Sequence, residues 1–203
     1  MAYVLGFIAA DGSLIKNKRG AYFIDIQSID KEIIYKIRDV FKSDIKIGEY
    51  QPKYENPNKR YRLQIGSKEI FKDLLRLGIT PQKSKTIKLP NIPDKYFSHF
   101  LRGYFDGDGS VNICTYKRKD RKKPATVINC GFVSGSKDIL EKIKNKLAKI
   151  NIIKGGTLYF HDRGYRLWFS INDSWRLYKF MYNTSNDLSL NRKKEIFEKY
   201  FKK

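Results

Sequence analysis

Residues 101–110 read LRGYFDGDGS, and residues 5–13 read LGFIAADGS. Both segments mix small residues with large apolar ones and end in Asp-Gly-Ser. Their aspartates, Asp11 and Asp108, lie 97 positions apart in a chain of 203 residues. A single Asp-Gly after a helix would be ordinary turn chemistry. Two copies in matched context indicate a repeated structural unit.

The similarity continues beyond these segments, which a chance pair of motifs would not do. The matched stretches are residues 24–37 with 130–143, 61–63 with 165–167, and 82–85 with the basic residues 192–194. We therefore predict a tandem duplication, with an N-terminal copy at 1–95 and a C-terminal copy at 96–203. Two copies are too few for a solenoid, so we expect them to pair about a pseudo-two-fold axis.

Hydrophobic periodicity predicts an α+β fold within each copy. Apolar residues recur at helical spacing in 30–43 and 136–150, and they alternate at strand spacing in 22–26, 61–65 and 165–169. The expected helix ends are N-caps at Ser67 and Ser136, a C-cap at Gly78, and a last helix opened by Ser189 and running through Phe201. Each copy thus reads helix, two strands, helix, two strands, helix (αββαββα). We expect two antiparallel sheets, each with helices on one face, whose other faces form a positively charged, DNA-binding saddle.

The charge balance indicates a polyanionic partner. Lys and Arg number 42 against 21 Asp and Glu, which gives a formal net charge of +21. No apolar run is long enough to span a bilayer, and there is no secretory signal pattern. We therefore expect an intracellular protein, in the cytoplasm or an organelle matrix, that binds nucleic acid and not a membrane. The two histidines and two cysteines have no metal-ligand spacing.

Small residues predict how the two copies meet. Gly6 and Ala10 are four positions apart, as are Gly103 and Gly107, so each pair shares one face of a helix. Small residues on a helix face allow two backbones to approach closely. The sequence therefore predicts that the helices of the two motifs form the seam between the copies.

The two aspartates would then face each other at the ends of these helices. Gly12 and Gly109 are expected to stop the helices, which leaves Asp11 and Asp108 near the pseudo-axis. Two carboxylates at the negative ends of two helix dipoles repel each other. Their placement makes sense if divalent cations occupy the gap, since Mg²⁺ prefers carboxylate, carbonyl and phosphate oxygens.

The two segments resemble the LAGLIDADG signature, and with their flanking similarity the resemblance covers essentially the whole chain. The second segment is a close match, whereas the first has Ala9 at the sixth position, where the signature has Asp. In this family the sixth position varies and the eighth carries the acid. The resemblance implies a single-chain, two-motif homing endonuclease. Such an enzyme hydrolyses both strands of double-stranded DNA at a long asymmetric site with divalent metal ions.

The resemblance also implies individual roles. The metal ligands would be Asp11, Asp108 and the backbone carbonyls of Ala10 and Gly107, with Mg²⁺ as the cofactor and Mn²⁺ as a substitute. A basic residue from each half would lie near the scissile phosphates, and the matched positions are Lys83 and Lys193. Ser28 and Ser134 follow equivalent strands and would help to order water. The protein would act as a monomer, without an obligate protein partner.

DNA contacts are expected from two kinds of segment. A basic run between two strands would contact phosphates, which supply affinity but little sequence information. Its residues are Lys117, Arg118, Lys119, Arg121, Lys122 and Lys123. Base recognition would come from the free sheet faces, since a two-stranded ribbon fits the major groove. The candidates there are Arg62, Gln64, Arg166 and Trp168.

Three alternatives remain open at this point. A DNA-binding regulator or an RNA intron maturase can use the same scaffold without cleaving DNA, although loss of the motif acids would be expected in a regulator. The chain could also be the endonuclease portion of an intein, although it has no N-terminal Cys or Ser nucleophile and no terminal His-Asn pair. An ordinary RNA-binding protein would explain the charge but not the repeated acidic motif.

Overall fold

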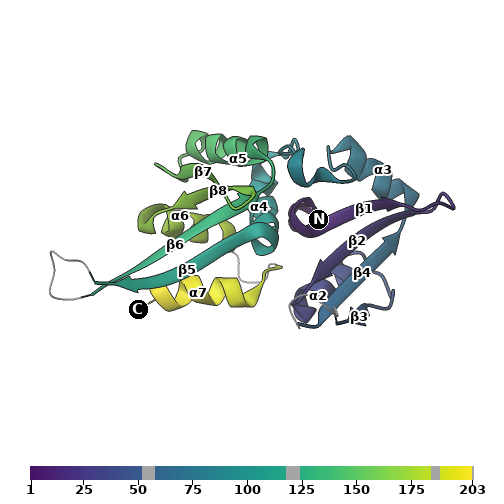
Figure 1. Ribbon diagram of the computed structural model, residues 1–203, viewed down its shortest axis with the longest axis horizontal. Coiled ribbons are helices and arrows are strands. Elements are labelled where there is room, and N and C mark those ends of the chain that lie inside the picture. The colour runs from purple at the N-terminus through teal and green to yellow at the C-terminus, as the bar shows by residue number, and fades with distance from the viewer. Residues whose placement is uncertain (52–57, 118–123, 184–187, 203) are drawn as a thin grey trace.

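The computed structural model describes residues 1–51, 58–117, 124–183 and 188–202. Its N-terminal part contains α1 (Ala2–Asp11), β1 (Gly12–Lys16), β2 (Tyr22–Ser28), α2 (Lys31–Val40), β3 (Gly48–Tyr50), β4 (Arg60–Gly66), α3 (Lys68–Arg76) and a 3-10 turn, η1 (Lys83–Lys85). Its C-terminal part contains α4 (Asp94–Asp108), β5 (Gly109–Tyr116), β6 (Ala125–Ser134), α5 (Lys137–Lys149), β7 (Thr157–His161), β8 (Gly164–Phe169), α6 (Ile171–Tyr182) and α7 (Asn191–Phe201). The order αββαββα occurs in both parts, and α7 is additional (Figure 1).

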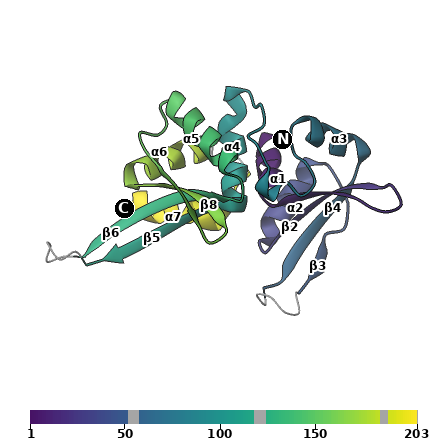
Figure 2. The same ribbon diagram turned by 45° about the horizontal axis from the view of Figure 1, so that its top comes forward.

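Each part forms one antiparallel sheet of four strands. The strand orders are β1-β2-β4-β3 and β5-β6-β8-β7, so the second sheet repeats the connectivity of the first. The sheets lie on either side of the central helices α1 and α4, and the remaining helices pack against the sheets (Figures 1 and 2). The predicted α+β class with two pseudo-symmetric repeats is confirmed.

The two faces of each sheet differ in character. In the first sheet, Ile24 and Ile26 of β2 pair with Ile65 and Leu63 of β4, and all four are buried against the helices. Their neighbours on the opposite face include Arg62 and Gln64, as the period of two in a strand requires. In the second sheet, Leu167 and Phe169 are buried on the helix side, so Arg166 and Trp168 lie on the opposite face. Each sheet therefore has a face that its helices leave uncovered.

Most predicted helix ends agree with the structure, and two need correction. Ser67 caps α3, with its hydroxyl accepting a bond from the Ile70 N–H at 3.2 Å, and Gly78 adopts a left-handed φ of +85° after that helix. The helix predicted to run to residue 43 ends at Val40, because Lys42 has a φ of +49°. The last helix is capped by Leu190 and not by Ser189. The hydrophobic periodicity of the sequence does not predict α6.

The seam between the two halves is a backbone-to-backbone contact between α1 and α4. A Cβ atom added at Gly6 would lie 2.0 Å from the Phe100 carbonyl oxygen, and one at Gly103 would lie 2.0 Å from the Tyr3 carbonyl oxygen. Only glycine fits at these two positions. Because α1 is buried on most of its surface, the seam is also the centre of the hydrophobic core. Within the described residues, no helix is long and apolar enough to cross a membrane.

Candidate active site at the helix seam

Asp11 and Asp108 are the last residues of α1 and α4. The following glycines do not use the left-handed conformation common at helix ends: Gly12 and Gly109 are extended, and each leads directly into a strand. A side chain is excluded at these glycines by crowding. A Cβ at Gly12 would lie 2.7 Å from the Ile8 Cα, and one at Gly109 would lie 2.3 Å from the ring of Phe105. The tight turns fix both aspartates at the seam.

The two aspartates lie close to the opposite half of the molecule. A Cβ at Gly107 would be 2.4 Å from the Ala10 Cβ and 3.2 Å from the Asp11 Oδ2. Asp11 and Asp108 line one open pocket of about 450 Å³, together with Lys83 and Ser134. A second pocket of about 210 Å³ is lined by Asp11, Gly107, Ser28 and Arg192. The helix ends therefore face two neighbouring pockets, with Asp11 common to both.

The proximity of the two carboxylates changes their titration. Burial is the main cause that raises the pKa of Asp108 from 3.8 to about 7, and the charge of Asp11 raises it further. Burial also raises the pKa of Asp11, although its side chain opens to solvent. The charges of Lys83 and Lys193 act in the opposite direction on both acids. Both pKa values nevertheless remain raised, so the two lysines only partly compensate for the burial of the two carboxylates.

Lys83 and Lys193 occupy equivalent places in the two halves. The ammonium group of Lys83 donates to the carbonyl oxygens of Ala10, at 3.2 Å, and Gly12. The ammonium group of Lys193 donates to the matched carbonyls of Gly107 and Gly109, at 3.2 and 2.6 Å. Both lysines are buried, at 6% and 5% exposure, which is unusual for this residue type.

Burial is the main cause that lowers the pKa of Lys193, to about 8, and it also lowers the pKa of Lys83. Lys193 makes two further bonds, to the carbonyls of Phe105 and Asp106, both at 2.8 Å. The two ammonium groups are therefore fixed at the helix ends, and each acts most strongly on the aspartate of the opposite half, Lys83 on Asp108 and Lys193 on Asp11.

A buried polar network, not predicted from the sequence, connects α4 to the start of α7. Asp106, at the sixth motif position, accepts hydrogen bonds from the Tyr3 hydroxyl at 2.7 Å, the Tyr182 hydroxyl at 2.9 Å and the Leu190 N–H at 2.7 Å. Burial raises its pKa, and these hydrogen bonds oppose the shift. Arg102 donates to the carbonyls of Leu188 and Met181 at 2.7 and 2.6 Å. Arg102 and Asp106, two charged residues within the otherwise uncharged stretch 100–107, were the available sequence indication of such a network.

Ser28 and Ser134 have equivalent local geometry. The Ser28 hydroxyl accepts from the Asp30 N–H, and the Ser134 hydroxyl accepts from the Ser136 N–H, both at 3.1 Å. Each serine lines a different one of the two pockets. The structure therefore places both predicted serines beside the helix ends.

The predicted DNA-contacting residues lie away from the seam. Arg62 bonds to the buried Asp25 at 2.6 Å, and Arg166 bonds to Asp162 at 3.3 Å, so part of their hydrogen-bonding capacity is used within the protein. Trp168 packs over Gly131, where a Cβ would lie 2.2 Å from the indole ring. Gln64 shares the helix-free face of the first sheet, and Lys117 is exposed after β5. Arg118, Lys119, Arg121, Lys122 and Lys123 lie outside the described residues.

The donor atoms at the seam suit a hard divalent cation. Among the described residues there is no group of three or more His, Cys, Asp or Glu side chains that could hold a metal. The seam instead offers two carboxylates and the carbonyls of Ala10 and Gly107, all of them oxygen donors. A carbonyl oxygen has two lone pairs, so the long lysine bonds to these carbonyls leave capacity for a second partner. Such an incomplete oxygen shell fits Mg²⁺, which commonly completes its coordination with water and phosphate.

The fold and the site together define a class of protein: a single chain in which two αββαββα units pair through glycine-faced helices and present paired carboxylates and buried lysines at the helix ends. Sequence comparison agrees with this class. The chain belongs to the LAGLIDADG-like domain family, whose profile matches residues 1–77 and 97–157.

Solved structures with the same fold include DNA complexes. The LAGLIDADG meganuclease I-AabMI, bound to uncleaved DNA, matches with a TM-score of 0.64 and 15% identity over 97% of this chain and 87% of that chain. The LAGLIDADG homing endonuclease I-LtrWI, bound to target DNA, matches with a TM-score of 0.62 and 14% identity over 99% of this chain and 89% of that chain. At these identities the likeness establishes the fold.

Relatives by sequence include archaeal proteins of different kinds. The DNA-directed RNA polymerase subunit Rpo1C of Methanocaldococcus jannaschii is 32% identical over 154 residues, which are 74% of this chain and 16% of that protein. A probable translation initiation factor IF-2 of Thermococcus kodakarensis is 38% identical over 76 residues, which are 36% of this chain and 6% of that protein. The chain thus matches only a small part of either relative.

Proposed function

We propose that the protein is a homing endonuclease that uses divalent metal ions to hydrolyse both strands of double-stranded DNA at a long asymmetric target. The main support is the doubled arrangement at the seam. Each half, 1–95 and 96–203, contributes one aspartate at a helix end and one buried lysine bonded to the carbonyls beside it. The DNA complexes among the fold neighbours support duplex DNA as the partner.

Asp11 and Asp108, with the carbonyls of Ala10 and Gly107, would hold Mg²⁺ or, as a substitute, Mn²⁺. When bound, the cation supplies positive charge that stabilises the phosphate as water displaces the 3′ oxygen in line. The carboxylates themselves fix where this charge sits, because each is held at a rigid helix end. Their mutual repulsion disfavours the metal-free site and so favours cation binding.

Lys83 and Lys193 would stabilise the scissile phosphates electrostatically. Two backbone carbonyls hold the ammonium group of Lys83, and four surround that of Lys193. Neither lysine therefore has to be ordered when DNA binds. A pKa of about 8 keeps Lys193 mostly protonated at neutral pH, yet lets it release a proton more readily than an ordinary lysine. Both lysines would therefore place a fixed positive charge beside the scissile phosphates.

The helix-free sheet faces would lie along the DNA, with Arg62, Gln64, Arg166 and Trp168 as candidates for base contacts. Lys117 and the basic residues after it would contact phosphates. The two halves differ at the sixth motif position, where Ala9 corresponds to Asp106. A pseudo-symmetric protein with unequal halves favours an asymmetric target, and it completes both sites within one monomer.

The relatives suggest that the chain is encoded by a mobile genetic element. Similar sequence occupies 16% of an RNA polymerase subunit and 6% of a translation initiation factor, two proteins of unrelated function. An endonuclease module carried by an intein would recur within unrelated host proteins in this way, because an intein is translated together with its host. The competing function is DNA or RNA binding without cleavage, as in a regulator or a maturase.

The test is cleavage of a randomised plasmid library by the purified protein with Mg²⁺, followed by sequencing of the ends. We expect discrete double-strand cuts at one long asymmetric motif, which EDTA abolishes. Asp11→Asn and Asp108→Asn should reduce the reaction to nicking or to nothing. Salt-sensitive nucleic-acid binding without cutting under any divalent metal would refute the endonuclease proposal in favour of the regulator or maturase.

A further inference from the structure

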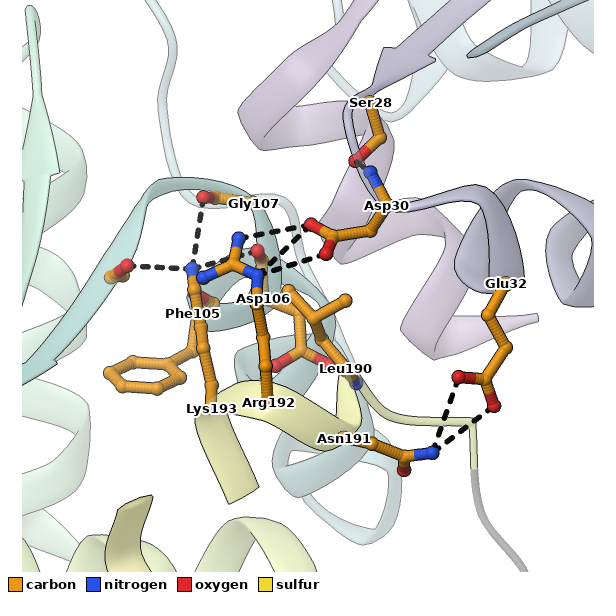
Figure 3. A network of polar contacts seen from close by, with 11 residues as sticks. Ser28, Asp30, Glu32, Phe105, Asp106, Gly107, Leu190, Asn191, Arg192 and Lys193 are labelled. Atoms are coloured by element: carbon orange, nitrogen blue, oxygen red, sulfur yellow. Dashed lines mark hydrogen bonds and ion pairs between the residues drawn. The ribbon is translucent and has the colours of Figure 1, made fainter. Parts of the chain in front are cut away.

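The first turn of α7 reaches across the seam to the N-terminal half. The guanidinium group of Arg192 donates to both carboxylate oxygens of Asp30, with Nε 2.9 and 3.1 Å and Nη2 3.0 Å from them. Beside it, the amide of Asn191 donates to the carboxylate of Glu32 at 3.1 and 3.3 Å. Figure 3 shows both contacts, with the guanidinium group of Arg192 next to the ammonium group of Lys193. Arg192 is thus oriented by a residue of the opposite half.

Arg192 also borders the reactive part of the molecule. It lines the smaller pocket, of about 210 Å³, together with Asp11, Gly107 and Ser28. Its charge is among the causes that lower the pKa of the adjacent Lys193. The side chain remains 53% exposed, whereas that of Asp30 is 20% exposed. A guanidinium group is therefore held at the rim of the pocket with much of its surface accessible.

The residue at the matched sequence position of the other half is neutral. The matched stretch has Gln82 before Lys83, where the C-terminal half has Arg192 before Lys193. Its contact with the opposite half is neutral and closely packed: the Ser136 hydroxyl donates to the Ile87 carbonyl at 2.8 Å, and a Cβ at Gly135 would lie 2.5 Å from the Ser84 carbonyl oxygen. The two lysine-bearing segments are therefore docked by different interactions.

The exposed ion pair is a weak reason to keep an arginine for stability alone, because such pairs contribute little in water. A guanidinium group, however, matches the geometry of a phosphate as well as that of a carboxylate. A DNA phosphate entering the smaller pocket would compete with Asp30 for the same donors. The carboxylate would then keep the guanidinium in position before DNA binds.

We propose that Arg192 is a phosphate-binding residue that serves only the Asp11–Gly107 side of the site, with Asp30 as the positioning residue that orients it across the seam. The proposal rests on the proposed endonuclease function and assigns a substrate contact within it. It implies that the two DNA strands meet unequal sites, one with an arginine directly before its lysine in the sequence and one with a glutamine there.

The first test measures binding without metal. A 30-base-pair duplex of fixed arbitrary sequence is titrated in EDTA over a range of salt concentrations with the wild type, Arg192→Gln, Asp30→Asn and the matched control Arg76→Gln. Arg76 lies in another exposed ion pair, with Asp73 on α3. Each phosphate contact contributes about one to the slope of log K against log salt. We expect Arg192→Gln to lower the slope by about one and Arg76→Gln to leave it unchanged.

Asp30→Asn separates phosphate binding from a merely structural role. Asp30→Asn and Arg192→Gln break the same ion pair, so they should lower the thermal midpoint alike. If Arg192 binds phosphate, Asp30→Asn retains or strengthens DNA binding, whereas Arg192→Gln weakens it. Equal weakening by the two variants, or no weakening by Arg192→Gln, would overturn the proposal.

The second test follows each strand of the cleavage target with a separate end label. Arg192→Gln should slow the cutting of one strand at least tenfold and change the other by less than twofold, so nicked product accumulates. Equal slowing of both strands would contradict a half-specific role. If the wild type cuts neither strand, the endonuclease proposal fails, and the salt-dependence experiment still decides whether Arg192 binds phosphate.

Discussion

Replacing Asp108 with Asn is expected to stabilise the metal-free protein at alkaline pH. The ionised carboxylate is costly there, because burial and the charge of Asp11 raise its pKa from 3.8 to about 7. A difference of this size between the unfolded and folded chain corresponds to ~4 kcal/mol against the folded state. Since the pocket is open to water, we reduce this to ~1–2 kcal/mol, which is a rise of roughly 2–8 °C in Tm for a chain of this length.

The pH dependence provides the check on the cause. The folded-state pKa lies above the unfolded one, so the destabilisation is complete above pH 7 and disappears as the pH falls towards 4. Thermal unfolding in EDTA should therefore show the gain from Asp108→Asn at pH 8 and none near pH 4. Asp44→Asn, at an exposed acid outside the pocket, is the control and should give no gain at either pH.

Metal should reverse the order of stability. A cation that binds only the folded state raises Tm according to its concentration and affinity. Mg²⁺ at pH 8 should thus raise the Tm of the wild type and have a smaller effect on Asp108→Asn. A loss of stability in Asp108→Asn at pH 8, or the same gain at pH 4 as at pH 8, would refute the reasoning from paired carboxylates.

Three further substitutions test the seam and the sheet by thermal or urea unfolding. Gly103→Ala places a Cβ 2.0 Å from a backbone oxygen of the facing helix, so it should lower the free energy of unfolding by about 3 kcal/mol. The control Gly48→Ala, whose Cβ would have its nearest atom at 3.8 Å, should lower it by less than about 1 kcal/mol. Equal losses would contradict the close approach of the two helices. Tyr3→Phe removes one of three hydrogen-bond donors from a buried carboxylate and should cost ~1–3 kcal/mol, and a neutral effect would argue against the network. Arg62→Gln removes the partner of the buried Asp25 and should cost ~1–3 kcal/mol; a second change, Asp25→Asn, should recover most of it if the cause is the unpaired charge.

The repeat made the centre of the molecule predictable from sequence. Glycine spacing specified which helix faces meet, and Asp-Gly placed the two acids at the helix ends. The pairing of Lys83 with Lys193 followed from aligning the two copies, and the structure puts both on equivalent carbonyls. These features depend on local spacing and on the symmetry of a duplication, both of which a sequence displays directly.

The parts that sequence did not predict depend on contacts between distant residues. Arg192 and Asp30 are 162 positions apart, and Tyr3 and Asp106 are 103 apart, so no local pattern could pair them. The helix α6 was missed because its apolar positions are mixed with polar and aromatic residues, among them the exposed Trp175. Tertiary packing on the second sheet decides that segment, and its intrinsic pattern does not.

The contact between Ala10 and Gly107 makes the two halves a matched but non-interchangeable pair. A Cβ at Gly107 would lie 2.4 Å from the Ala10 Cβ, so the methyl group of one helix occupies the space that the other helix leaves empty. Two copies of the N-terminal half could not close in the same way, because two methyl groups would compete for one volume. Two copies of the C-terminal half would have room to spare. The two halves are therefore complementary at this contact and not equivalent, because a methyl group is accommodated in one of them only.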